Sequence, residues 1–294
     1  MKPQAEFPIT PPDRRIYLAY DGSINADWVS RYAIRLASSL EDRRINLLHI
    51  PDGTYPTDTI GLKIKAIENE CSFHGIRLEV RVIPLSGNVF RTLVRSIPEG
   101  PASFCVCGAR ITSRGRGFLR GTISEKLLRA KKFNVLALRV VQPGLLGFAD
   151  ELLVPLAGHP RGFRAAQPFF SLLVPVIRSL YLLRIMEMGP LSLRYISREK
   201  ARELYQEGLA YVRRVAEEIR KETGDGRISF RLDTRVVLSD DWVKEVLVHA
   251  GRLKTRLILL GASERPYPSA LLQGGRLERL LRKTPCDVAV YRSV

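Results

Sequence analysis

The chain has 294 residues and is 45% hydrophobic, so it can bury a core in each of two domains of ordinary size. Its formal net charge of +17 indicates either an anionic partner (nucleotide phosphate, nucleic acid or an acidic membrane) or a surface kept soluble by arginine. Because lysine and arginine are spread along most of the chain, we favour the second interpretation for the bulk of the charge.

The first part of the chain predicts alternating strands and helices. Residues 1–14 are polar and rich in proline, which predicts a disordered lead rather than a secretory signal. Apolar runs then predict strands over Ile16–Tyr20, Ile45–Ile50 and Ile76–Ile83, with helical spacing between them. The third of these alternates apolar and polar residues, so we place it toward an edge of the sheet. A short helix, Asn88–Ile97, comes next.

The following stretch, Phe104–Arg139, contains a buried strand, a loop rich in glycine and arginine, a helix and a second buried strand. The same pattern recurs in the second half of the chain at a shift of 153 positions, as from Gly121 to Gly274. So many identities at one shift predict a tandem duplication. Further matches are Glu125 with Glu278 and Leu127-Leu128-Arg129 with Leu280-Leu281-Arg282.

Proline and glycine within residues 141–149 predict a linker between a first domain, residues 15–140, and a second, residues 150–294. The most apolar run, Pro168–Met186, is interrupted by proline and arginine, so it predicts a buried helix and strand rather than a membrane span. The expected strands of this domain are Leu152–Leu156, Leu180–Ile185, Ile228–Val237, Leu257–Gly261 and Val288–Tyr291, and its expected helices include Phe163–Val176, Ser197–Thr223 and Asp240–Ala250.

Each connection between consecutive strands is long enough for a helical crossover, which requires a parallel sheet with helices on both faces. The sequence therefore predicts an α/β fold of two tandem doubly wound domains, each with a five-stranded parallel sheet. The four cysteines fit neither a disulfide framework nor a zinc pattern, and we expect them to be buried thiols of a cytoplasmic protein.

In an open parallel sheet, ligands bind beyond the carboxyl ends of the strands, and the first domain carries suitable residues there. Asp21 follows the first strand, where its carboxylate can accept a hydrogen bond from a ribose hydroxyl. Gly108 follows the fourth strand, and Gly121 and Thr122 precede the next helix. Glycine at each end of the loop lets backbone N–H groups point at an anion, and the helix N-terminus adds partial positive charge. Thr122 is expected to cap the helix or bond a phosphate oxygen.

With these pieces in place, the chain resembles the universal stress protein family, in the form with two domains in one chain. The resemblance covers nearly all of Arg15–Val294 and is carried by Tyr17–Ser23, Leu47–Asp52 and Cys107–Leu128. It implies a Rossmann-like fold of the adenine-nucleotide alpha-hydrolase-like class, and ATP, with Mg²⁺ as an accompanying ion, as the ligand of the first domain.

The ATP-binding members of that family have a first glycine, a second three residues on, a third ten after that, and then serine or threonine. Ile111 stands in the second glycine's place, and its β-branched side chain is expected to displace the loop or change its path. Arginines of the loop can replace backbone donors with charged ones. The site residues that the resemblance implies are Asp21, Gly22, Ile50 (where adenine would pack), Gly108, Arg110, Gly121, Thr122 and Ile123.

The second domain departs further from the family pattern. Ala157 stands where the first domain has Asp21, Glu264 occupies the second glycine's place, and Gly274 is followed by Gly275 instead of a hydroxyl residue. A carboxylate that faces a triphosphate weakens its binding. We therefore predict that the second domain does not bind ATP and serves as a structural partner of the first.

The function expected from the sequence is that of a cytoplasmic regulator that binds an adenine nucleotide in its first domain. The alternatives are a family member that acts as a protein-association scaffold without nucleotide binding, and a basic nucleic-acid-binding protein. No Ser/His/Asp arrangement, metal-ligand cluster or P-loop indicates an enzyme, although slow ATP hydrolysis stays open. Asp240-Asp241 is expected to be a helix N-cap rather than a pair of catalytic carboxylates.

The resemblance also implies association through the last strand of each domain. Val135–Val140 and Val288–Tyr291 are apolar enough to pair, so we expect an intrachain pseudo-dimer of the two domains. Whether two chains then form a homodimer is left open, and no membrane partner is expected.

Overall fold

The computed structural model describes residues 14–109, 122–143, 147, 149–157, 163–223, 230–262 and 276–294. The elements of the first half are β1 (Arg15–Tyr20), α1 (Ile24–Ala37), β2 (Arg44–His49), α2 (Thr57–Phe73), β3 (Arg77–Val82), α3 (Val89–Ser96), β4 (Gly100–Gly108), α4 (Ile123–Ala130) and β5 (Phe133–Arg139).

The elements of the second half are β6 (Glu151–Leu156), α5 (Gln167–Leu173), β7 (Ser179–Glu187), α6 (Pro190–Tyr195), α7 (Arg198–Thr223), β8 (Arg231–Ser239), α8 (Trp242–Arg252), β9 (Leu257–Gly261), α10 (Arg276–Lys283) and β10 (Asp287–Arg292). The order of strands and helices predicted from hydrophobic periodicity is confirmed, and β3 lies at an edge of the sheet. The exception is α6, which hydrophobic periodicity did not predict.

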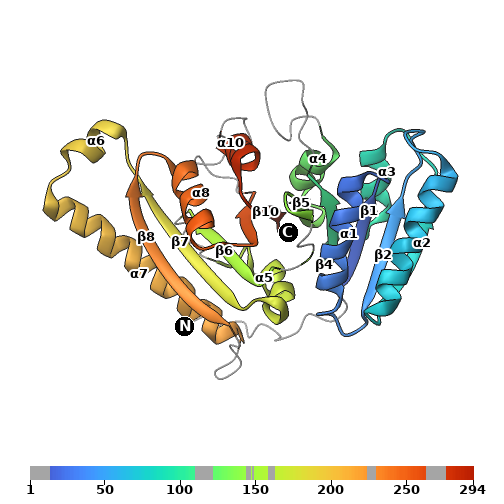
Figure 1. Ribbon diagram of the computed structural model, residues 1–294, viewed down its shortest axis with the longest axis horizontal. Coiled ribbons are helices and arrows are strands. Elements are labelled where there is room, and N and C mark those ends of the chain that lie inside the picture. The colour runs from blue at the N-terminus through green and yellow to red at the C-terminus, as the bar shows by residue number, and fades with distance from the viewer. Residues whose placement is uncertain are drawn as a thin grey trace, which may run out of the picture.

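The ten strands within the described residues form one sheet, in the order β3-β2-β1-β4-β5-β10-β9-β6-β7-β8 (Figure 1). Neighbours pair in parallel within each half. The two halves meet where β5 and β10 pair in antiparallel, with Val135 opposite Arg292 and Arg139 opposite Val288. The pairing expected from these two apolar strands is therefore present, and it joins two five-stranded parallel sheets into a single sheet.

Two apolar clusters, one on each face of the sheet, hold the helices in place. Alternate residues of a strand point to opposite faces, so Ile16 and Leu18 of β1 belong to one cluster while Tyr17 belongs to the other. One face carries α1, α2, α5 and α7, and the other carries α3, α4, α8 and α10. Both clusters contain residues of both halves, so neither core stops at the junction.

The duplication is visible in matching contacts of α4 and α10. Glu125 forms an ion pair with Arg129 at 3.0 Å, and Glu278 forms one with Arg282 at 2.7 Å, at the same spacing along each helix.

The cysteines are buried and free, as expected. Within the described ranges, the helices contain no stretch with both the length and the apolar character needed to cross a bilayer.

A buried carboxylate ties the two halves together beside the β5–β10 pair. Asp287, the first residue of β10, is 2% exposed. Its Oδ2 accepts a hydrogen bond from the Tyr32 hydroxyl of α1 at 2.5 Å, and its Oδ1 accepts from the backbone N–H groups of Val141 and Gln142 at 2.7 and 3.1 Å. Burial and the charge of Asp287 raise the pKa of Tyr32 well above its usual range, so the hydroxyl stays a donor.

Replacing Asp287 with alanine should leave the buried hydroxyl of Tyr32 and the two backbone N–H groups of Val141 and Gln142 without this acceptor. We expect the free energy of unfolding to fall by about 3 kcal/mol, and by about 1 kcal/mol for Tyr32→Phe, which removes a single donor. Asp240→Ala, at an exposed carboxylate, is the control and should change stability by less than about 0.5 kcal/mol. Urea unfolding followed by circular dichroism measures all three, and equal midpoints for Asp287→Ala and Asp240→Ala would contradict this role.

Candidate functional site at the carboxyl edge of the first half

The predicted site residues gather where the strand order reverses, because β1 lies between β2 and β4. Ala19 of β1 pairs with Cys107 of β4, and Tyr20 pairs with His49 of β2. These registers place Asp21, Ile50 and Gly108 at the same edge of the sheet, each within two residues of a paired position.

The structure assigns different environments to the individual residues. Asp21 is exposed, and Thr122 and Ile123 are half-buried at the start of α4. Ile50 is only 6% exposed and packs in the same apolar cluster as Ile123, so its side chain serves mainly the core. Arg110, Gly121 and the departing Ile111 lie outside the described residues.

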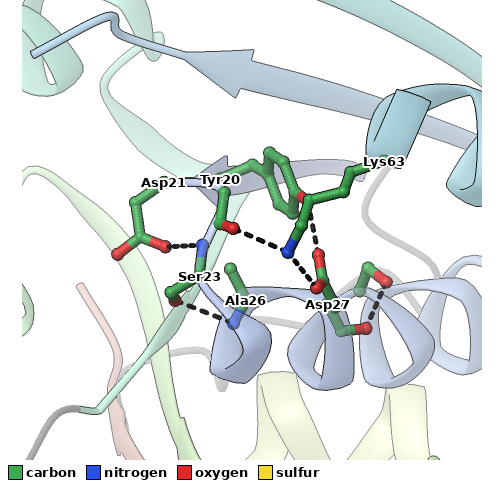
Figure 2. Close-up of polar contacts among 8 residues, drawn as sticks. Tyr20, Asp21, Ser23, Ala26, Asp27 and Lys63 are labelled. Atoms are coloured by element: carbon green, nitrogen blue, oxygen red, sulfur yellow. Dashed lines mark hydrogen bonds and ion pairs between the residues drawn. The ribbon is translucent and has the colours of Figure 1, made fainter. Parts of the chain in front are cut away.

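The turn that follows β1 is fixed by two local hydrogen bonds (Figure 2). Oδ1 of Asp21 accepts from the backbone N–H of Ser23 at 2.9 Å. Oγ of Ser23 accepts from the backbone N–H of Ala26 at 3.2 Å and caps α1. Such side-chain bonds to nearby backbone N–H groups make Asp and Ser favourable at turns and helix starts. The carboxylate of Asp21 therefore has a defined position at the strand end.

A second set of contacts reaches this turn from α2. The ammonium of Lys63 donates to the carbonyl oxygen of Gly22 at 2.9 Å and to Oδ2 of Asp27 at 2.6 Å, and the hydroxyl of buried Tyr20 donates to Oδ1 of Asp27 (Figure 2). Burial, followed by the hydrogen bond to Asp27, raises the pKa of Tyr20 far above its usual range, so the hydroxyl remains protonated. No motif or spacing in the sequence singles out Lys63 or Asp27.

Two glycines at the edge have side-chain atoms of other elements close to them. Gly22 has φ +78°, and a Cβ there would lie 2.1 Å from Cδ1 of Ile60 in α2. At Gly108, a Cβ would lie 2.3 Å from Nδ2 of Asn25 in the first turn of α1. The amide of Asn25 therefore lies against the end of β4, where it adds a hydrogen-bond donor that no sequence motif indicates.

Thr122 is the N-cap of α4, as the sequence predicted. Its hydroxyl oxygen accepts from the backbone N–H of Glu125 at 3.2 Å. Asp241 caps α8 in the same manner and accepts from Lys244 at 3.1 Å, which confirms its interpretation as a cap.

The edge of the first half thus combines a carboxylate, an amide and the start of a helix. These groups suit a ligand that has both hydroxyl groups and an anionic end.

The corresponding edge of the second half is cross-linked by ion pairs. Arg276 of α10 contacts the carboxylate of Glu187 at the end of β7 through both of its Nη atoms, at 2.5 and 2.7 Å. Arg279 pairs with the cap residue Asp241. A cavity of about 260 Å³ at this edge is lined by Ala157 and Arg276 among others, and it is smaller than the roughly 300–1,000 Å³ of typical ligand pockets.

Within the part of the chain that the structure describes, no group of three or more His, Cys, Asp or Glu side chains could hold a metal ion. His49 is a strand-end residue whose Nδ1 lies 3.0 Å from the carbonyl oxygen of Tyr20.

Gly22→Ala tests how closely α2 presses on the turn. Its matched control is Gly53→Ala, because Gly53 has φ +79° and a Cβ there meets nothing within 4 Å. The positive φ alone should cost about 1 kcal/mol of unfolding free energy in either variant. The contact with Ile60 should cost Gly22→Ala about 2 kcal/mol more. Urea unfolding of both variants measures the difference, and equal losses of stability would show that α2 does not confine the turn.

No protein-family model matches the sequence, and no curated protein is similar to it in sequence. Solved structures, however, share its fold over almost the whole chain. A universal stress protein from Archaeoglobus fulgidus has a TM-score of 0.61 and 17% identity, over 94% of this chain and 95% of its own.

Two further structures show the same arrangement. A functionally unknown protein from Pseudomonas aeruginosa has a TM-score of 0.59 and 12% identity, over 95% of this chain and 92% of its own. The cytoplasmic domain of a prokaryotic cation chloride cotransporter has a TM-score of 0.57 and 13% identity, over 96% of each chain. At such identities the likeness concerns the fold, and the chain resembles universal stress proteins in having their fold in a tandem, two-domain form.

Proposed function

We propose that the protein is a universal stress protein-like regulator that binds one adenine nucleotide at the carboxyl edge of its first half. The observation that carries this proposal is the fixed turn of Asp21 beside Gly108, at the point where the strand order reverses. The fold shared with a universal stress protein supports it as well.

Each end of the nucleotide would have its own partners at this edge. A carboxylate accepts several hydrogen bonds, so Asp21 can accept from a ribose hydroxyl while its Oδ1 holds Ser23. The start of α4 at Thr122 favours phosphate, because the partial positive charge of the helix dipole attracts an anion there. Mg²⁺ would enter with the nucleotide, held largely by phosphate oxygens and water.

The second half would support the first without binding nucleotide itself. The ion pair between Arg276 and Glu187 occupies the edge where phosphates would lie, and breaking it would cost stability. Because β5 and β10 pair with each other, neither strand is available to pair with a second chain. The two halves would therefore act as an intrachain pseudo-dimer, in a binding protein rather than an enzyme.

A second candidate is a protein-association scaffold. The same fold forms the cytoplasmic domain of a prokaryotic cation chloride cotransporter. The ion pairs of α10 with Glu187 and Asp241 also favour a structural use of the second half. This candidate differs from the first in having no nucleotide site.

Mass spectrometry of the small molecules released on denaturing the purified protein, followed by calorimetric titration with ATP, separates the two candidates. We expect released adenine nucleotide and one binding event per chain. Asp21→Ala should weaken ATP binding by about 10- to 100-fold, because a hydrogen bond to a charged group contributes about 1.5–3 kcal/mol.

Asp42→Ala is the control for this experiment, because Asp42 is an exposed carboxylate that precedes β2 at the opposite end of the strands. It should bind ATP as the wild type does. A protein that releases no nucleotide and gives no heat with ATP would support the scaffold.

A further inference from the structure

One peptide group in the turn after β1 is held from both of its ends. Its C=O belongs to Gly22 and accepts from the ammonium of Lys63 at 2.9 Å. Its N–H belongs to Ser23 and donates to Oδ1 of Asp21 at 2.9 Å. In a trans peptide these two groups point in opposite directions within the peptide plane, so Lys63 and Asp21 lie at opposite edges of the same peptide group (Figure 2).

The turn needs such a restraint because of its glycine. Gly22 has φ +78°, and glycine populates positive and negative φ about equally, so the peptide plane that follows it can rotate at little cost. Rotation of that plane would turn the N–H of Ser23 away from Asp21. The carboxylate would then lose its hydrogen bond from the Ser23 N–H, which helps to set its direction.

The ammonium of Lys63 is itself fixed by contacts on the same side of the turn. Asp27 accepts from it at 2.6 Å, and the hydroxyl of Tyr20 holds the other oxygen of Asp27. The side chains of Lys63 and Asp27 are 27% and 32% exposed, so water screens the pair less than it screens an ordinary surface pair. The positive charge of Lys63 beside the C=O also polarises the peptide group. This polarisation strengthens the hydrogen bond that the Ser23 N–H donates to Asp21.

We propose that Lys63 is the positioning residue of the nucleotide site: through the Gly22–Ser23 peptide it holds the Asp21 carboxylate in the direction from which it binds a ribose hydroxyl. This inference rests on the proposed function. Lys63 would act through Asp21 and would select ligands that carry the hydroxyl, such as ribonucleotides, over their deoxy analogues.

The test is a comparison of ATP with 2′-deoxy-ATP and 3′-deoxy-ATP, by calorimetric titration of the full chain. The wild type should bind ATP about tenfold more tightly than the analogue that lacks the hydroxyl facing Asp21. Lys63→Met should reduce this ratio to below about threefold and leave the affinity for that analogue within about twofold of the wild type's. Lys63→Arg, which keeps a charged donor, should restore most of the ratio.

Lys65→Met is the matched control. Lys65 is an exposed lysine of the same helix, and replacing it with methionine also removes one positive charge. It should leave the ratio unchanged. Thermal unfolding establishes that each variant is folded, and Lys63→Gln replaces Lys63→Met if the methionine variant does not fold.

The outcomes distinguish the two proposals. A wild type that discriminates between ATP and the analogue, together with a Lys63 variant that discriminates equally well, overturns the positioning role alone. Equal weakening of ATP and both analogues in Lys63→Met also overturns it, since a general loss of structure would act in this way. A wild type that binds none of the three nucleotides overturns the proposed function, and this inference with it.

Discussion

The antiparallel pairing of β5 with β10 is the contact on which the rest of the structure depends. Both strands are buried along most of their length, and their pairing makes one sheet of two parallel halves. Each half would otherwise expose an apolar edge strand, which is a site for aggregation. Because the strands are joined within the chain, the apolar clusters on both faces run across the junction without a break.

The carboxylate of Asp287 fixes the geometry of that junction. At the first residue of β10, it accepts hydrogen bonds from a hydroxyl of α1 and from two backbone N–H groups of the segment that follows β5. A buried carboxylate is tolerated only where hydrogen bonds replace the water that it has lost. Asp287 thus joins the first half, the linker and the second half at one point, close to the strand pairing.

The sequence predicted those features that depend on local pattern. Alternating and helical periodicity located the strands and helices, and the residues at helix starts identified Thr122 and Asp241 as caps. Periodicity did not reveal α6, which has six residues and is too short to show a repeat. The role of Ile50 was only partly anticipated, since burial at the end of β2 leaves little of its side chain for a ligand.

Contacts between residues distant in the chain could not be predicted. Lys63 lies 41 positions from Gly22, and nothing in the sequence of α2 distinguishes it from Lys65. Asn25 was hidden for another reason: its amide is brought against Gly108 by the packing of α1 on β4, which no spacing encodes. Such residues become visible only when the elements are placed in space.

The two halves differ most at the edge of the sheet formed by the carboxyl ends of their parallel strands. In the first, a carboxylate is held at a turn, and hydrogen-bond donors lie near it. In the second, Ala157 stands in the place of that carboxylate, and Arg276 links α10 to β7. A duplicated chain can lose one site while the other is kept, because the fold depends on the strands and the two cores. One binding site per chain is what this asymmetry leads us to propose.

Native mass spectrometry of the intact chain, titrated with ATP, counts the sites directly. We predict that binding saturates at one nucleotide per chain. Two nucleotides per chain would show that the second half also binds, and none at saturating ATP would contradict a nucleotide site in the first half.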